Sequence, residues 1–454
     1  MILHRRNKME LIYILDSAIA SIQNLESYYL SQIDVVMKRV KENGEKYKYG
    51  VVLEKFFFSK AIEDDEFQIS EYEKKLLDEI LEEYHIEQSD TGLTVQYKLK
   101  NPGLIEKKYE LNPHRAIAEF RKLSEQPEIL NDSTIMMILV RYEEAIAELF
   151  RYLIGKYPAA YLNDKSITYA ELIKLDTEIK NIRKIFLDKE VDEIMRQPIS
   201  YWYSLFEGKH KVKFCFPNDE FESFKEIYYR RNLVVHNQGV VNDNYIANIK
   251  TEMIVGDKAR IDKSYLKNAF EITQIVIYGT IIGLGKLSSN VSAILNRLFD
   301  LGFQHMLDDE WRISEYIFGN LLKHKGQDNA ELLCNKINYW ISIKNQGRFE
   351  EIQKEIEEFD VSAHSGRFKA AKYALLDKFD KVTEILEEIM GQELQASHVE
   401  SWPLFKQYRE SEEYSAFRQR HNELFEVKGY EPEYVKADEE DLLVGECDGT
   451  AKIV

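Results

Sequence analysis

An arginine, an amide and a histidine lie within six residues of one another, at Arg231, Asn232 and His236. A guanidinium stays charged and binds phosphate in a bidentate way, and an imidazole gives up or takes a proton near neutral pH. RNA cleavage without a metal needs a base for the 2′-hydroxyl, an acid for the 5′-oxygen and a cation for the phosphorane. A cation and a titratable imidazole are among the groups that such a reaction needs.

The segment that carries them, from Pro217 to Gly239, has the signals of one helix. Asn218 is a good N-cap, acidic residues follow in the first turn, and Gly239 is a typical C-terminal stop. Helical spacing puts Arg231 near the middle of an apolar stripe made of Phe221, Phe224, Ile227, Tyr228, Val234 and Val235. A buried unpaired charge is costly, so Arg231 requires a carboxylate partner, a second chain or an anionic ligand.

The same helix does not align the two groups within one chain. Arg231 and His236 point about 140° apart around the helix axis. A two-fold dimer that pairs this helix with its copy would bring two arginines and two histidines together. Such a dimer would hold a composite site, with groups from both chains.

The residues resemble a known family at this point. The run from Arg231 to His236 is similar to the R-(N/D/H)-x3-H signature of HEPN domains, and Asn237 and Gly239, followed by Tyr245, resemble its RN…VHN.G subgroup. The resemblance covers roughly the stretch from Asp132 to Lys286. It implies an α-helical dimer and, in many members, metal-independent RNA cleavage.

Carried over to this sequence, the resemblance implies His236 as general acid and base, Arg231 as phosphate clamp and Asn232 as an orienting group. It implies substrate contacts from Arg230, Asn237 and Tyr245. The product would carry a 2′,3′-cyclic phosphate, and no cofactor or metal is expected. Family members with appended repeats are often toxins or abortive-infection effectors in phage defence.

Two other interpretations stay open: a non-catalytic scaffold, and a domain that a partner nucleotidyltransferase modifies with a nucleotide. Arg231 and His236 can be a paired arginine and a core histidine, and the protein is then a non-catalytic HEPN-like scaffold that dimerises and binds a protein or nucleic acid. Glu144 and Glu148 stack four residues apart on the preceding long helix and are candidate partners for Arg231, or simply a solvated face. The remaining histidines show no metal-binding spacing, so we expect no metal site.

Composition favours a helical, cytoplasmic protein. The chain has 8 prolines and 20 glycines in 454 residues, and its 3 cysteines are too far apart for a disulfide framework. No signal peptide is evident, and the uncharged run from Ile272 to Gly285 is too short to span a membrane, which predicts a buried core helix and no membrane partner. The net charge of −18 argues against non-specific nucleic-acid binding.

The pattern along the chain predicts a mainly α protein in four parts: a mostly helical region over 1–130 with a β-hairpin near 91–111, a HEPN-like helical bundle over 131–290, tetratricopeptide-like helical repeats over 291–430, and an acidic, disordered tail over 431–454. The repeats follow from apolar residues at Phe349 to Phe359 whose spacing recurs 30 residues later. Such an α-hairpin solenoid usually binds a peptide or another protein domain. The family resemblance implies that this partner is a regulator, an antitoxin or a phage component.

Overall fold

The computed structural model describes residues 11–46, 52, 70–72, 74–75, 84–88, 95–99, 118, 121–163, 165–166, 168, 179–214, 216–325 and 327–425. These residues are mainly helical, as the composition predicts. They divide into two compact units. The first contains the described residues up to His305 together with Glu310–Gln327, and the second contains Met306–Asp309 and the described residues from Asp328 onward.

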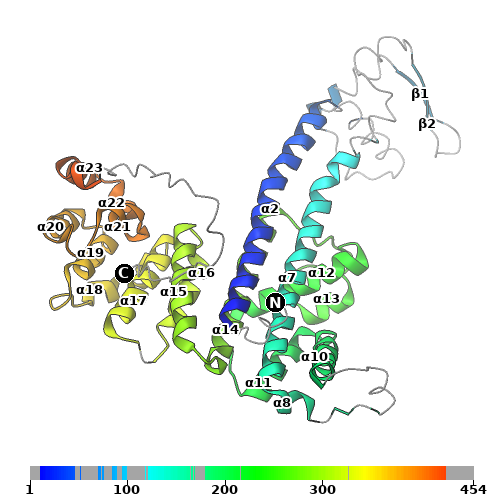
Figure 1. The fold of residues 1–454 in the computed structure, drawn as a ribbon. Helices are drawn as coiled ribbons and strands as arrows, with labels where there is room; N and C mark the ends of the chain where they lie inside the picture. The colour runs from blue at the N-terminus through cyan, green and yellow to red at the C-terminus, as the bar shows by residue number, and fades with distance from the viewer. Residues whose placement is uncertain are drawn as a thin grey trace, which may run out of the picture. The chain divides into compact units, whose positions relative to one another are not determined.

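Two long helices of the first unit, α2 (Leu11–Lys46) and α7 (Gln126–Lys156), run antiparallel side by side (Figure 1). The buried face of α2 has the spacing of an amphipathic helix, with Leu11, Ile14, Leu15, Ala18 and Ile22 in the core. Tyr29 of α2 donates to Asn131 Oδ1 of α7 at 2.9 Å. The predicted division near residue 130 therefore does not separate these helices, because the apolar face of α2 is covered by α7 and α14.

The core helix of the unit is α14 (Lys263–Leu284), which packs against α2, α7 and α12 (Asn218–Asn237). It is the one helix among the described residues that is long and apolar enough to cross a membrane, but 72% of that stretch is buried inside the unit. The prediction of a buried core helix over 272–285 is confirmed, and the helix begins earlier, at Lys263. An apolar helix needs such cover on every side, which the neighbouring helices of the unit provide.

Between α7 and α12 in the chain lie the helices α8 (Pro158–Leu162), α10 (Ile179–Met195) and α11 (Ile199–His210). Tyr203 connects α11 to α7 and α14: its hydroxyl shares hydrogen bonds with Tyr142 at 2.9 Å and with Thr280 at 2.7 Å. Its ring meets Phe221 of α12 edge-on, with centroids 4.9 Å apart. This buried hub fixes the first turn of α12 against α7 and α14.

Two helices that were predicted to start the repeats, α15 (Val291–Leu307) and α16 (Trp311–Leu321), belong to the first unit up to His305 and from Glu310 onward. Polar contacts, as well as apolar packing, attach these two helices to the first unit. Arg312 of α16 donates to Glu220 of α12 at 2.6 Å, and buried His305 of α15 shares a 2.7 Å hydrogen bond with Tyr278 of α14.

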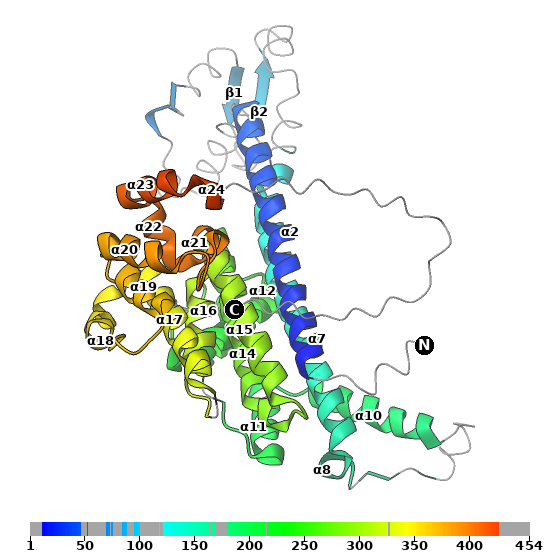
Figure 2. The ribbon, with the colours of Figure 1, turned by 60° about the vertical axis from the view of Figure 1, so that its left-hand side comes forward.

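The second unit is a succession of short helices (Figure 2). Its elements are α17 (Asn329–Asn345), η3 (Phe349–Glu351), α18 (Gln353–Glu358), α19 (Gly366–Leu375), α20 (Phe379–Ile389), α21 (Ala396–Ser401), η4 (Pro403–Phe405), α22 (Lys406–Arg409), α23 (Glu412–Arg420) and α24 (Asn422–Phe425). Buried Ala370, Ala371 and Ala374 let α19 approach α20 closely. Lys344 ties α17 to the end of α19, donating to Leu375 O at 2.9 Å.

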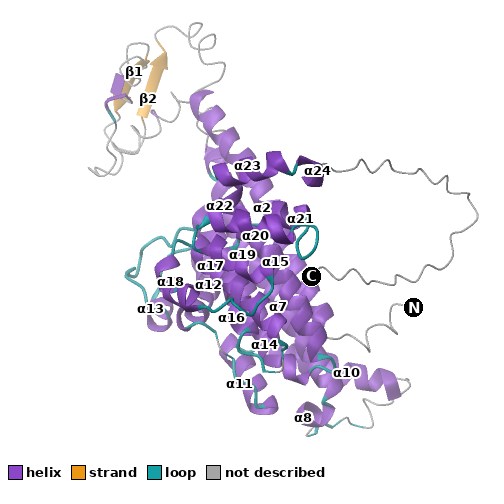
Figure 3. Ribbon diagram, turned by 90° about the vertical axis from the view of Figure 1, so that its left-hand side faces the viewer, coloured by secondary structure: helices purple, strands orange, loops and turns teal. Residues whose placement is uncertain are grey.

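One pair of strands lies among the described residues (Figure 3). β1 (Tyr84–Gln88) and β2 (Val95–Leu99) are antiparallel, with Ile86 opposite Tyr97. β2 overlaps the first strand of the predicted hairpin, but its partner precedes it in the chain rather than following it. The rest of the predicted hairpin, up to residue 111, and the predicted acidic tail, 431–454, lie outside the described residues.

Candidate active site

Helix α12 ends in a left-handed turn that the residues after His236 build. Gln238 and Gly239 have φ of 53° and 74°, a region that costs a glycine little. The Gly239 amide donates to Leu233 O at 2.9 Å, and Asn237 Nδ2 donates to Val240 O at 2.6 Å. The HN.G run therefore has a structural role at the helix end, and Asn237 contributes its amide group to that turn.

Arg231 has a carboxylate partner on the neighbouring helix. Its Nη2 donates to Glu143 Oε1 of α7 at 2.7 Å, and its Nη1 donates to Asn232 Oδ1 at 3.2 Å. The guanidinium also lies 5.2 Å from the centre of the Tyr228 ring. The side chain of Arg231 is 20% exposed, so the pair lies at the edge of the core and solvent reaches it.

Burial raises the pKa of the Glu143 carboxyl, and the Arg231 guanidinium pulls it in the opposite direction. The prediction that Glu144 or Glu148 pairs with Arg231 is wrong. These side chains pair instead with Arg141 at 2.9 Å and with Arg151 at 2.8 Å on their own helix. Glu143 was missed although the sequence holds a signal for it. It follows buried Leu139 by four residues and precedes buried Ile146 by three, which places it at the edge of the buried stripe of α7.

Arg230, rather than Arg231, is the buried arginine of α12. Its Nε donates to Glu226 Oε1 at 2.6 Å, its Nη1 donates to Arg260 O at 2.9 Å, and its guanidinium stacks 4.6 Å from the Tyr265 ring. Glu226 also accepts from Tyr245 Oη at 2.5 Å and from Tyr265 Oη at 2.8 Å. We call these four side chains, Glu226, Arg230, Tyr245 and Tyr265, the Glu226–Arg230 cluster.

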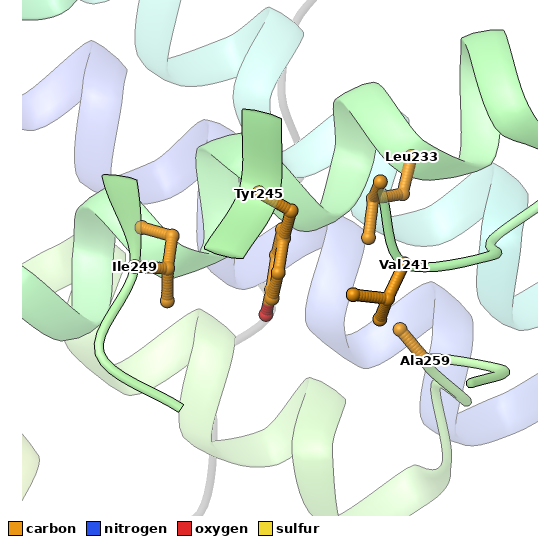
Figure 4. Close-up of a cluster of buried hydrophobic side chains, with 5 residues drawn as sticks. All are labelled: Leu233, Val241, Tyr245, Ile249 and Ala259. Carbon is orange, nitrogen blue, oxygen red and sulfur yellow. The ribbon is translucent and has the colours of Figure 1, made fainter. Parts of the chain in front are cut away.

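The prediction that Arg230 and Tyr245 contact substrate is therefore not met by their positions, because both are inside the protein. A guanidinium is tolerated there because a carboxylate, a carbonyl and two tyrosines replace its water. Figure 4 shows the apolar side of the same arrangement. The ring of Tyr245 packs with Leu233, Val241, Ile249 and Ala259, which hold the segment after α12 against the helix.

That segment contains α13 (Asp243–Asn248), whose start is capped by Asn242 Oδ1 accepting from the Tyr245 amide at 3.0 Å. An isolated antiparallel bridge joins Val240 to Lys258. Lys258 also donates to Gln238 O at 2.6 Å, at the end of α12. The last turn of α12, which carries His236, is thus held by a compact loop.

His236 is exposed in that last turn, and no described residue hydrogen-bonds to it. Val235 beside it is 48% exposed. Of the predicted site residues, the structure keeps Arg231, Asn232 and His236 within reach of the surface. It places Arg230 and Tyr245 in the interior and Asn237 in the helix end.

Comparisons with protein-family models, with curated proteins and with solved structures found no match to this chain. Within the described residues, no group of three His, Cys, Asp or Glu side chains could hold a metal ion. Two adjacent helices therefore supply a fixed cation from Arg231, an amide from Asn232, a titratable imidazole from His236 and a carboxylate from Glu143.

Proposed function

We propose that this protein is a cytoplasmic, metal-independent endoribonuclease of the HEPN type that acts as a homodimer. One observation supports the proposal most: His236, exposed and without a hydrogen-bond partner among the described residues, follows Arg231 by just over one turn on a well-anchored helix. The proposal also uses the motif resemblance, which supplies the reaction type.

In the proposed reaction the 2′-oxygen of the RNA attacks the adjacent phosphorus and the bond to the 5′-oxygen breaks. One His236 imidazole takes the 2′-hydroxyl proton, and the imidazolium of the second copy gives a proton to the leaving 5′-oxygen. Arg231 binds the non-bridging oxygens and stabilises their growing charge. The products are a 2′,3′-cyclic phosphate and a free 5′-hydroxyl.

Asn232 accepts a hydrogen bond from Arg231, so it orients the guanidinium. Glu143 has a double effect in this scheme. It holds Arg231 in place at 2.7 Å, and it occupies the nitrogen that would otherwise bind phosphate. The RNA phosphate must therefore compete with a carboxylate whose pKa burial has raised.

Exposed apolar side chains on the same two helices support the dimer. Met137 and Val140 of α7 are 36% and 39% exposed and precede Glu143 by one to two turns. Val235 of α12 follows Arg231 by one turn. A two-fold contact over these residues would bury apolar surface and bring the two copies of His236 near the two copies of Arg231.

We place the protein among prokaryotic toxins and abortive-infection effectors on the strength of the motif resemblance. The short packed helices of the second unit then form tetratricopeptide-like repeats that bind a regulator or antitoxin. Buried alanines on α19 are the kind of small residue that such interlocking hairpins need.

The test is cleavage of total RNA by purified protein in EDTA. We expect His236→Ala and His236→Gln to lower the cleavage rate at least 100-fold, since each removes a general acid and base. Both should keep the thermal stability of the parent because His236 is exposed. Lys250→Ala is the matched control: it removes an exposed lysine that follows α12 in the chain and should leave the rate unchanged.

The alternative, a non-catalytic scaffold, is favoured by one specific observation: Arg231 already has a carboxylate partner. Glu143→Gln separates the two functions. A nuclease held back by this pair should cleave faster when the carboxylate becomes a neutral amide. A scaffold should leave RNA intact with either side chain, and intact RNA with the unaltered protein in the presence and absence of EDTA would exclude the nuclease.

A further inference from the structure

A cavity of about 670 Å³ lies in the first unit, away from the residues of the candidate active site. It is bordered by the last turns of α14, by η2 (Gly285–Leu287), by α15 and α16, and by the segment that follows α11. These helices can be followed in Figure 2. The volume is within the range of small-molecule sites in proteins, roughly 300–1,000 Å³.

The floor of the cavity is aliphatic. Its apolar lining comes mainly from α14, α15 and α16, and consists of Ile282, Val291, Ile294, Leu295, Leu298 and Leu321. Tyr316 is the one Phe, Tyr or Trp residue in the lining, and it is buried; the exposed imidazole of His324 belongs to the rim. The floor is therefore suited to a hydrocarbon chain and offers no exposed ring on which a nucleobase could stack.

Two glycines let the walls close around this floor. A Cβ at Gly279 would come within 2.4 Å of Tyr316 Oη, and a Cβ at Gly283 would come within 2.7 Å of the Phe214 ring. Both contacts are too short for real side chains. The bare face of α14 at these positions is thus required for the close packing that shapes the cavity.

The rim is basic. Lys211, Lys213, Lys286 and Lys323 line it together with His324, and all five side chains are exposed. No described acidic residue is part of the lining, although the chain as a whole has 79 acidic against 61 basic residues. Lysines elsewhere in the unit, such as Lys165 and Lys263, have carboxylate partners within 2.7 Å.

None of the four rim lysines forms an ion pair with a described carboxylate. Lys286 Nζ instead donates to Lys211 O at 2.8 Å, which joins η2 to the left-handed residue after α11. Four like charges around one opening repel each other, and an anion placed between them relieves that repulsion. A strongly hydrated point charge such as an ammonium serves both carboxylate and phosphate.

From this combination we infer that the cavity binds an amphiphile whose aliphatic chain occupies the floor and whose anionic headgroup, a carboxylate or a phosphate monoester, lies among the rim lysines. The inference is independent of the proposed nuclease. The aliphatic chain binds to the floor because its apolar surface is buried there. The lysines of the rim favour a headgroup that carries negative charge.

The experiment uses the full chain and a fluorescent fatty acid, cis-parinaric acid, below its micelle concentration. Palmitate and an acyl lysophosphatidic acid then compete as the two headgroup arms, with ATP as a nucleotide competitor. We expect both amphiphiles to displace the probe, and the tighter of the two identifies the headgroup. Displacement by ATP as effective as by the amphiphiles would overturn the inference, as would an absence of probe binding.

Two variants locate the site. Lys213→Glu combined with Lys286→Glu should weaken probe binding at least tenfold, and Val291→Trp, which fills the floor, should do the same. Lys184→Glu combined with Lys250→Glu is the control, because it makes the same change of net charge at exposed lysines outside the cavity. Each variant is first shown to melt within a few degrees of the parent. Equal loss of binding in the rim and control pairs would overturn the inference.

Discussion

At the level of single residues, two adjacent arginines of α12 have opposite environments. Arg230 is 7% exposed and makes four polar or stacking contacts within the Glu226–Arg230 cluster and with Arg260 O. Arg231 has a side chain that is 20% exposed and one carboxylate partner. Burial gives Arg230 a stabilising role, and the partly exposed Arg231 is the arginine that the proposed function uses to bind phosphate.

We therefore predict that Arg230→Lys and Arg231→Lys differ sharply in stability. A lysine at 230 cannot span a carboxylate, a carbonyl and a ring at once, so the free energy of unfolding should fall by about 3 kcal/mol. At 231 the pair is partly solvated, and the loss should stay below about 1 kcal/mol. Urea unfolding followed by circular dichroism measures both, and equal losses would refute the assignment.

Periodicity predicted α12 and its ends to within a residue but exchanged the roles of these two arginines. The apolar stripe contained Val234 and Val235, yet Leu233 is the buried residue and Val235 is half exposed. The error has a physical cause. The partners of Arg230 are Glu226 on the same helix and two tyrosines, Tyr245 and Tyr265, that are brought to it only by the fold of the following loop. Local spacing does not contain that information.

At the level of elements, acidic side chains gather where α2 and α14 approach the start of α16. Burial, with Glu310 and Glu271 next in effect and Lys267 opposing, raises the pKa of Glu26 on α2 to about 7. Burial also raises the pKa of Glu271 on α14, against the lowering effect of Arg312. Glu310 hydrogen-bonds the buried imidazole of His305. Near neutral pH, the Glu26 carboxyl is therefore partly protonated in the folded protein.

This predicts that stability falls as the pH rises. The folded protein holds the Glu26 proton more tightly than the unfolded chain, so the stabilisation is fully present below about pH 4.5 and is lost as the pH passes 7. The loss is at most about 3 kcal/mol. Glu26→Gln should raise the Tm at pH 8 by a few degrees and change it little at pH 5.

Differential scanning calorimetry at the two pH values measures this. Glu42→Gln is the matched control on the same helix, because Glu42 is exposed and makes only a loose pair with Lys38 at 3.8 Å. A Glu26→Gln variant with the same Tm difference from the parent at both pH values would show that Glu26 is ionised in the folded protein across this range.

Sequence patterns fixed the types of the elements better than their grouping. The core helix α14 and the long helix α7 follow from apolar content and spacing, and both are present. The attachment of α2 to them depends on contacts such as Tyr29 to Asn131, between residues 102 positions apart, which no local pattern encodes. The same holds for Arg312 and Glu220, which place α16 with the first unit.

At the level of the whole molecule, the proposed function requires two copies of the chain. Arg231 and His236 are on one helix but point in different directions, so one chain presents a clamp and an acid–base group that do not face a common phosphate. The apolar side chains Met137, Val140 and Val235 remain exposed on the helices that carry Glu143 and Arg231. In the proposed dimer, association through these residues would complete the site, and activity should therefore follow the dimer fraction.

We predict that Val235→Asp gives a monomer and abolishes RNA cleavage while Arg231 and His236 are intact. Two carboxylates brought together across a two-fold axis repel each other, and the lost apolar contact adds to that effect. Tyr201→Asp is the control: Tyr201 is 44% exposed on α11, which packs at the opposite end of α12 through Tyr203 and Phe221. Light scattering after size exclusion gives the mass, and cleavage is measured on the same fractions.

Dilution of the unaltered protein should lower the specific activity as the dimer dissociates, whereas a monomer that cleaves RNA at a constant specific rate would exclude the composite site.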